Sequence, residues 1–164
     1  MLSIVVKEHN ETVDKIGRII EQASNIPIEK ELIFVTSKTA SEFSYILETL
    51  SSERYNLTIR YIPSIKNSGE AVTLGAQYSR GDNILVIDCH VCFSPDDTIM
   101  LIDTLERNPD SMVTPGIYHT DFPSCIVSNN KIVDDTAIGY GSRIRISSGN
   151  SFEWIWLPKQ KDTV

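Results

Sequence analysis

An aspartate and a histidine follow a short apolar run and could together bind a metal ion or a phosphate group. Residues 81–90 contain four consecutive apolar residues, 84–87, and then Asp88, Cys89 and His90. This pattern is typical of a buried strand with polar ligands at its carboxyl end. Because residues two apart in a strand leave the same face, the carboxylate and the imidazole can converge on one ligand while Cys89 points the other way. The alternative is a strand-end hydrogen bond between Asp88 and His90 without an ion.

The elements around these residues are expected to alternate between strands and helices. Apolar runs predict four strands, at residues 3–6, 31–35, 57–62 and 84–88. Apolar residues at helical spacing predict four helices, at about residues 12–24, 43–50, 67–81 and 95–108. This order predicts an α/β fold in which a mainly parallel sheet carries helices on both faces through right-handed crossovers. Such sheets bind ligands beyond the carboxyl ends of their strands, where Asp88 and His90 lie.

Some details of these elements can also be predicted. The strand at 57–62 alternates and has one polar face, so we expect it near an edge of the sheet. Ser94, Pro95 and the two following aspartates form a strong helix start. The helix after Asn67 is expected to end at Gly81. Its inward-facing residues are expected to be Ala71, Leu74, Gly75 and Tyr78.

The last third of the chain is rich in strands. Short apolar runs predict a strand at 112–114, a hairpin at 125–133, and strands at 143–147 and 152–157. These strands would join an edge of the sheet in a mixed or antiparallel arrangement. Because strand edges that remain exposed can pair with another chain, a homodimer is plausible.

Composition restricts the class of protein. The chain has 164 residues and is 41% hydrophobic, which suits a single domain over residues 1–164 that can bury a sizeable core. The net charge is −7 and the acidic residues are scattered, so the sequence gives no sign of a basic surface that would bind nucleic acid. No apolar run approaches the length of a membrane span, and no signal peptide is recognisable, so a cytoplasmic location is expected. Three cysteines do not make a disulfide framework and fit a reducing compartment.

Four short motifs resemble those of family 2 glycosyltransferases, which have the nucleotide-sugar-binding GT-A fold. Residues 3–11, Ser-Ile-Val-Val-Lys-Glu-His-Asn-Glu, are similar to the first strand of that family, with Lys7 where proline is usual. The second strand, 31–35, is followed by Thr36 and Ser37 where the family usually has acids. Asn67-Ser68-Gly69 resembles the family's Asn-X-Gly helix start, and residues 88–90 stand where the family has Asp-X-Asp, here in an Asp-X-His form.

The resemblance implies a GT-A-like, three-layer αβα architecture with a strand-rich C-terminal tail. Residues 1–118 would form the nucleotide-sugar-binding half and residues 119–164 a reduced acceptor-side half. Asp88 and His90 would hold a divalent metal ion. An imidazole in the ligand set shifts the preference from Mg²⁺ toward Mn²⁺. The implied contacts to the nucleotide-sugar are Val6, Glu8, His9, Ser37, Asn67 and Asp88.

Several of these residues have simpler explanations. His9 is more easily explained as a solvated loop histidine, and Asn67 as a helix cap, although a cap can also bind a ligand. Asp134 and Asp135 are candidates for the general base that deprotonates an acceptor hydroxyl, or they form the turn after the hairpin.

Other pairs in the sequence also suggest a site. Cys89 and Cys92 form a single Cys-X-X-Cys pair, which is too few ligands for a zinc site, so buried and inert cysteines are expected. Two further pairs share a strand face and could contact a sugar or a phosphate, or simply pack or be solvated: Trp154 with Trp156, and Arg143 with Arg145.

The sequence therefore predicts a glycosyltransferase-like protein. It would bind a nucleotide-diphospho-sugar donor with Mn²⁺ or Mg²⁺ and transfer the sugar to the hydroxyl of an acceptor that the sequence does not identify. An alternative is a catalytically degenerate module that binds a sugar nucleotide or glycan, or a partner subunit. A nucleotidyltransferase is less favoured, because the segment after the first strand lacks a glycine-rich loop.

Overall fold

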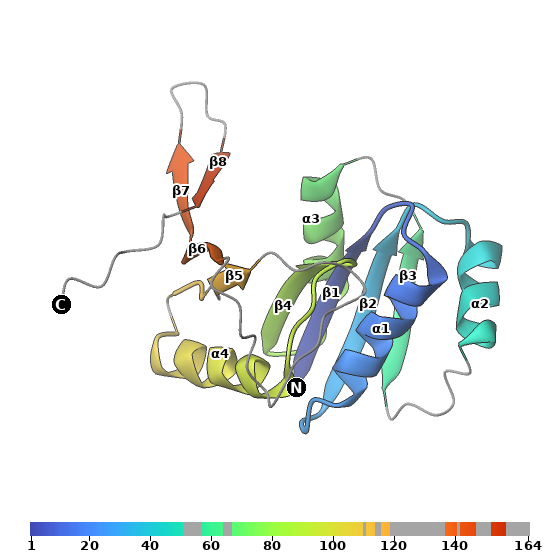
Figure 1. Ribbon diagram of the computed structural model, residues 1–164, viewed down its shortest axis with the longest axis horizontal. Coiled ribbons are helices and arrows are strands. Elements are labelled where there is room, and N and C mark those ends of the chain that lie inside the picture. Colours follow the sequence, from blue (N-terminus) through green and yellow to red (C-terminus); the bar gives the residue numbers. More distant parts are fainter. Residues whose placement is uncertain are drawn as a thin grey trace. The chain divides into compact units, whose positions relative to one another are not determined.

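The computed structural model divides the chain into two compact units, which are Met1–Pro95 and Asp96–Val164. Figure 1 shows their helices and strands. The structure describes residues 1–50, 57–63, 67–109, 111–113, 116–118, 137–140, 142–146 and 152–156. No helix in these ranges has both the length and the apolar content needed to cross a membrane.

The first unit is built on a parallel sheet of four strands in the order β3-β2-β1-β4 (Figure 1). The strands are β1 Leu2–Glu8, β2 Lys30–Thr36, β3 Thr58–Pro63 and β4 Asn83–Asp88. In the register of β1 with its neighbours, Lys7 lies between Val35 and Asp88, so the carboxyl ends of β1, β2 and β4 meet at one edge. β3 lies at an end of this sheet, as its alternating sequence predicted.

Helices cover both faces of the sheet, which confirms the predicted α/β layers. They are α1 Val13–Ser24, α2 Ala40–Thr49 and α3 Ser68–Tyr78. Phe43 of α2 packs against Phe34 of β2 with ring centroids 5.1 Å apart, and Leu50 at the end of α2 contacts α1 at Gly17. On the opposite face, α3 approaches β1 so closely that a Cβ on Gly75 would lie 2.1 Å from Cγ1 of Val5.

β4 is less buried than its apolar run predicted. It lies at the other end of the four-stranded sheet, and β1 is its partner there. Its side chains Ile84 and Val86 are 42% and 39% exposed. An apolar run shows that residues tend to be buried, but it does not show how many elements cover them. Here α3 packs over β1 and β2.

The end of α3 also differs from the prediction. The helix ends at Tyr78, whose side chain is exposed, and Ser79 is the C-cap. Ala71 and Gly75 are buried as predicted. Gly81 is required for another reason, because a Cβ at this position would lie 2.6 Å from the backbone nitrogen of Ser3. The glycine signal therefore marked a close approach between two segments and not a helix cap.

The described residues of the second unit form one long helix and two antiparallel strand pairs. α4 Pro95–Arg107 starts at the proline that the sequence indicated. β5 Gly116–Tyr118 pairs with β6 Ala137–Tyr140, and β7 Ser142–Ile146 pairs with β8 Phe152–Trp156. The strand predicted at 112–114 instead begins at Gly116, and β6 was not predicted. The hairpin expected at 125–133 lies outside the described residues.

Candidate functional site

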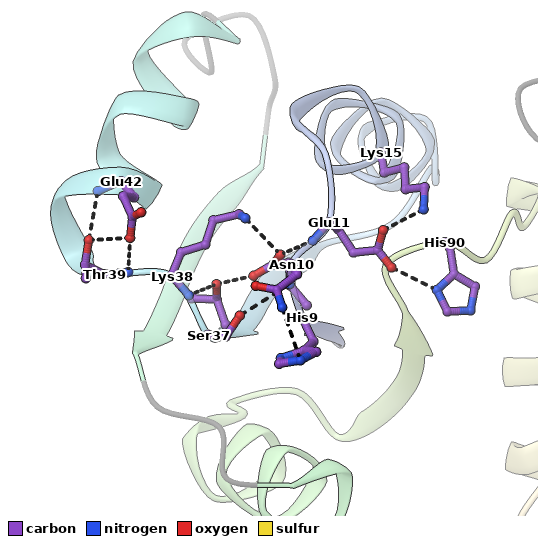
Figure 2. A network of polar contacts seen from close by, with 11 residues as sticks. His9, Asn10, Glu11, Lys15, Ser37, Lys38, Thr39, Glu42 and His90 are labelled. Carbon is purple, nitrogen blue, oxygen red and sulfur yellow. Dashed lines mark hydrogen bonds and ion pairs between the residues drawn. The ribbon is translucent and has the colours of Figure 1, made fainter.

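Polar side chains gather at the carboxyl edge of the sheet in the first unit, where β1, β2 and β4 end (Figure 2). They come from the ends of β1 and β4 and from the segments that follow β1, β2 and β4. Contacts between charged groups link these segments, and they are Glu11 with His90, Glu8 with Lys38, and Lys7 with Asp88. This edge is where an open α/β sheet binds ligands.

His90 is held by a carboxylate from the start of α1. Its Nδ1 lies 3.1 Å from Oε1 of Glu11, while Oε2 of Glu11 lies 2.6 Å from Nζ of Lys15 (Figure 2). Burial acts to raise the pKa of the Glu11 carboxyl, but the hydrogen bonds and charges of Lys15 and His90 outweigh it and lower this pKa. An ionised carboxylate only accepts hydrogen bonds, so Nδ1 of His90 carries the proton. The His90 side chain is 58% exposed, so the ring is open to solvent.

Glu8 is a fully buried carboxylate that fixes the loops around the site. Oε1 accepts a hydrogen bond from the backbone nitrogen of Glu11 at 2.7 Å, and Oε2 accepts one from the hydroxyl of Thr36. Nζ of Lys38 lies 3.3 Å from Oε1 and balances the charge. Buried charges require such partners, and removing one partner is costly. Glu8 therefore ties the turn before α1 to the end of β2.

Asp88 is paired with a lysine from the neighbouring strand. Its Oδ1 lies 2.9 Å from Nζ of Lys7, and the same ammonium group donates to the hydroxyl of Ser68 at 3.1 Å. The Asp88 side chain is 44% exposed and that of Lys7 is 22% exposed. The pair therefore lies at the surface of the edge and is accessible to a ligand.

The other predicted binding residues occupy different environments. Val6 is fully buried in the core. His9 is exposed, with Nε2 3.4 Å from Nδ2 of Asn10, and Ser37 accepts a hydrogen bond from the backbone nitrogen of Asn10 at 3.3 Å. Asn67 is the N-cap of α3 and accepts from the backbone nitrogen of Glu70 at 2.9 Å, which confirms the cap. Their roles toward a nucleotide-sugar stay predictions.

The turn after β1 depends on an unusual backbone conformation. Asn10 has a φ of 56°, in the left-handed region, which asparagine adopts more readily than most residues. This conformation directs the Asn10 backbone nitrogen toward Ser37 and leads the chain into the Glu8 and Glu11 contacts. The turn is therefore fixed by backbone and side chain together.

Cys89 is buried, whereas the side chains of Asp88 and His90 on either side of it are partly exposed. Burial, together with the negative charges of Glu8 and Glu11, raises the pKa of its thiol to about 12. Because the thiolate is the form that binds metal or reacts, this cysteine is inert at neutral pH. Cys89 is a free thiol, so it forms no disulfide with Cys92.

The donor atoms of Asp88 and His90 fit a divalent cation in type and in access. A carboxylate oxygen and an imidazole nitrogen are ligands of Mn²⁺ and, for the oxygen, of Mg²⁺. Both side chains are exposed at the same edge. Within the described ranges, no three His, Cys, Asp or Glu side chains are grouped to hold a metal ion. A cation here would need further ligands from its substrate or from water, and it would have to displace Lys7 from Asp88.

Some candidate residues have no described side chain. Asp134 and Asp135 lie outside the described residues. The four remaining candidates belong to β7 and β8. They are Arg143, Arg145, Trp154 and Trp156.

The sequence did not single out Lys7, Glu11 or Lys38 for a role in the site. The signal that could have identified them is a charged residue at or just after the end of an apolar strand. At such a position a charged group can reach both an oppositely charged partner and solvent.

Comparisons with known proteins agree with the fold. The model of the family described as "Glycosyl transferase family 2" matches residues 3–150. An "Uncharacterized glycosyltransferase" of Haemophilus influenzae (strain ATCC 51907 / DSM 11121 / KW20 / Rd) is 29% identical over an alignment of 119 residues, and the match covers 67% of this chain and 36% of that protein.

Two solved structures of S. aureus TarS 1-349 are also similar. One has a TM-score of 0.46 and 14% identity, and covers 65% of this chain and 33% of the TarS chain. The other, in complex with UDP, has a TM-score of 0.46 and 17% identity, and covers 64% and 32%. The chain thus spans about a third of the length of these relatives.

Proposed function

The chain belongs to glycosyl transferase family 2, and from this premise we propose that its carboxyl edge binds a nucleotide-diphospho-sugar and transfers the sugar to an acceptor hydroxyl. The observation that carries the proposal is the placement of Asp88 and His90, both exposed, at the ends of the strands that the family motifs contain. Both side chains are accessible, and each is held by a neighbouring charge.

In this proposal Asp88 and His90 bind the diphosphate end of the donor through a divalent cation, Mn²⁺ or Mg²⁺. The bound cation supplies positive charge to the phosphate oxygens as the bond to the sugar breaks. When the imidazole is neutral, the ionised Glu11 favours the proton on Nδ1, so that Nε2 presents a lone pair. Glu8 holds the turn that carries Glu11, so the ligand set is preorganised before the substrate arrives.

The remaining predicted residues have supporting roles in the proposal. Asn67, Ser37 and His9 lie around the same edge and would contact the nucleoside. Asp134 and Asp135 remain the proposed general bases for the acceptor hydroxyl. A module that binds the sugar nucleotide without catalysis is the competing proposal.

Calorimetric titration of the full chain tests the site. A panel of nucleoside diphosphates is titrated with Mn²⁺ and with EDTA into the wild-type protein and into Asp88→Ala and His90→Ala. We expect Mn²⁺ to strengthen binding in the wild type, and each substitution to remove most of that gain. Asp82→Ala is the matched control, because this carboxylate is 88% exposed and pairs with the amino terminus next to the opposite end of β4.

Two further outcomes decide between the proposals. If no nucleoside diphosphate binds the wild-type protein under either condition, the proposed function fails. If binding is present but no nucleotide-sugar is hydrolysed or transferred over a panel of donors, the protein is a binding module and not an enzyme.

A further inference from the structure

Lys7 places a positive charge inside the edge where the diphosphate is proposed to bind. It is the second-to-last residue of β1, and its Cα is the register partner of Asp88 at the end of β4. Because paired residues of neighbouring strands point to the same face, the ammonium group reaches the Asp88 carboxylate directly. Nζ lies 2.9 Å from Oδ1 of Asp88 and 3.1 Å from the hydroxyl of Ser68, the first residue of α3.

The partner of Lys7 distinguishes it from the other lysines that pair with acids at this edge. Lys38 neutralises Glu8, which is completely buried, and Lys15 bonds to Glu11, which is 16% exposed. Those two carboxylates also hold the turn before α1 and the imidazole of His90. Asp88, by contrast, is 44% exposed and is itself a proposed ligand of the cation. The charge of Lys7 is therefore paired with a group that the substrate complex would engage.

The Lys7–Asp88 contact is also easily exchanged. Ion pairs between partly exposed groups contribute little net stability, because water and salt compete with them. An ammonium group has three N–H donors, and the structure assigns two of them, to Asp88 and to Ser68. The Ser68 hydroxyl would keep the ammonium in place while its carboxylate partner changes. A phosphate oxygen can then accept from the same nitrogen as a charge-assisted hydrogen bond.

We propose that Lys7 is a phosphate-binding residue of this site, and that it competes with a divalent cation for Asp88. This inference rests on the proposed function. It has two consequences with opposite signs. The diphosphate keeps a cation-independent part of its affinity through Lys7, whereas Mn²⁺ binds more weakly than it would to an unpaired Asp88.

Titration with inorganic pyrophosphate tests the first consequence without involving a nucleoside. The full chain is titrated in EDTA as wild type, Lys7→Met, Lys7→Gln and Lys7→Arg. We expect Lys7→Met and Lys7→Gln each to weaken pyrophosphate binding about tenfold or more, as for the loss of one hydrogen bond to a charged group. Lys7→Arg should retain most of the affinity because it keeps the charge. Lys30→Met is the matched control, since Lys30 lies at the amino end of β2 and bonds to the carbonyl of Ile26.

Titration with MnCl₂ alone tests the second consequence. Here Lys7→Met and Lys7→Gln should bind Mn²⁺ more tightly than the wild type. Adding Asp88→Ala to either variant should remove that gain. A general loss of folding cannot produce tighter metal binding, and circular dichroism of each variant checks the fold directly. The two neutral variants differ in polarity, so one that fails to fold leaves the other as the test.

The outcomes separate this inference from the proposed function. The inference is overturned if Lys7→Met and Lys7→Gln, both folded, bind pyrophosphate in EDTA as the wild type does. It is also overturned if the wild type binds pyrophosphate and nucleoside diphosphates only in the presence of Mn²⁺, and that result leaves the proposed function standing. Absence of binding by both ligands under every condition overturns both.

Discussion

Glu11 decides which ring nitrogen of His90 carries a proton. The Nδ1 to Oε1 distance of 3.1 Å and the lowered pKa of Glu11 fix the carboxylate as the acceptor. Metal-binding histidines are generally oriented in this way by a second group, which also sets the tautomer. In the proposed site Glu11 would therefore be a positioning residue, because it would act through His90.

Replacing Glu11 by glutamine should weaken the Mn²⁺ affinity of the site by about 10- to 100-fold, the usual cost of losing an outer-shell partner. Glutamine can donate as well as accept, so it does not impose the Nδ1-protonated tautomer. Calorimetric titration with MnCl₂ measures the affinity, and ¹⁵N-resolved NMR of the imidazole reports the tautomer directly. Glu29→Gln, an exposed residue at the amino end of β2, is the control. An unchanged tautomer and unchanged affinity would show that Glu11 has no positioning role.

At the scale of the element, α2 begins with a capping box whose strength should depend on pH. The hydroxyl of Thr39 accepts from the backbone nitrogen of Glu42, and the carboxylate of Glu42 accepts from the backbone nitrogen of Thr39 at 2.8 Å (Figure 2). Hydrogen bonds from the Thr39 side chain and backbone lower the pKa of Glu42 below its ordinary value of 4.5. A lowered carboxyl pKa means that the folded state favours the ionised form.

The contribution of Glu42 to stability is therefore complete above pH 4.5 and is lost as the pH falls through the lowered value in the folded protein. Thr39→Ala should lower the unfolding free energy by about 1 kcal/mol at pH 7, the usual cost of losing an N-cap. The difference between wild type and Glu42→Gln should shrink as the solution is acidified. Urea unfolding at pH 7 and at pH 3.5 measures both effects. If the difference in unfolding free energy between wild type and Glu42→Gln is the same at both pH values, the ionised form of Glu42 does not stabilise the start of α2.

The sequence predicted which segments form strands and helices better than it predicted which of these elements lie side by side. The apolar runs of β1 and β2 and the start of α4 at Pro95 depend on local periodicity and capping, which the sequence records directly. The position of β4 at an end of the sheet depends on which strands pair, and its apolar run did not reveal that. Likewise the sequence placed Asp88 and His90 at the carboxyl end of an apolar strand, but it did not identify their partners Lys7 and Glu11. Those contacts depend on the parallel register of β1 with β4, which is a property of the fold.

At the scale of the whole molecule, the charge balance makes local positive groups necessary. The chain has a net charge of −7, and a diphosphate is also an anion. The summed field therefore opposes binding, so affinity has to come from groups in direct contact with the phosphates. Lys7 and a divalent cation are the two proposed sources of such charge at the edge of the sheet.

Binding of a donor should stabilise the protein against heat. At a free ligand concentration of 100 times Kd, binding to the folded state adds about 2.7 kcal/mol. For a chain of this size, that corresponds to an increase in Tm of roughly 5–10 °C. Differential scanning fluorimetry with the best-binding nucleoside diphosphate and Mn²⁺ measures the shift. Asp82→Ala should show the full increase and Asp88→Ala little of it. Equal increases in the two variants would place the ligand elsewhere.

The pairing of β1 with β4 also bears on how the protein is made. β1 is synthesised first, yet one of its two flanking strands begins only at Asn83. The contact between Glu11 and His90 spans 79 positions along the chain. Once β1, β2 and β3 have emerged from the ribosome, three of the four strands of this sheet can already pair. Until β4 is synthesised, one edge of β1 keeps unpaired backbone N–H and C=O groups that another chain could bind. During translation, the contacts of Lys7 with Asp88 and of Glu11 with His90 therefore form through the same late event that covers this edge of β1.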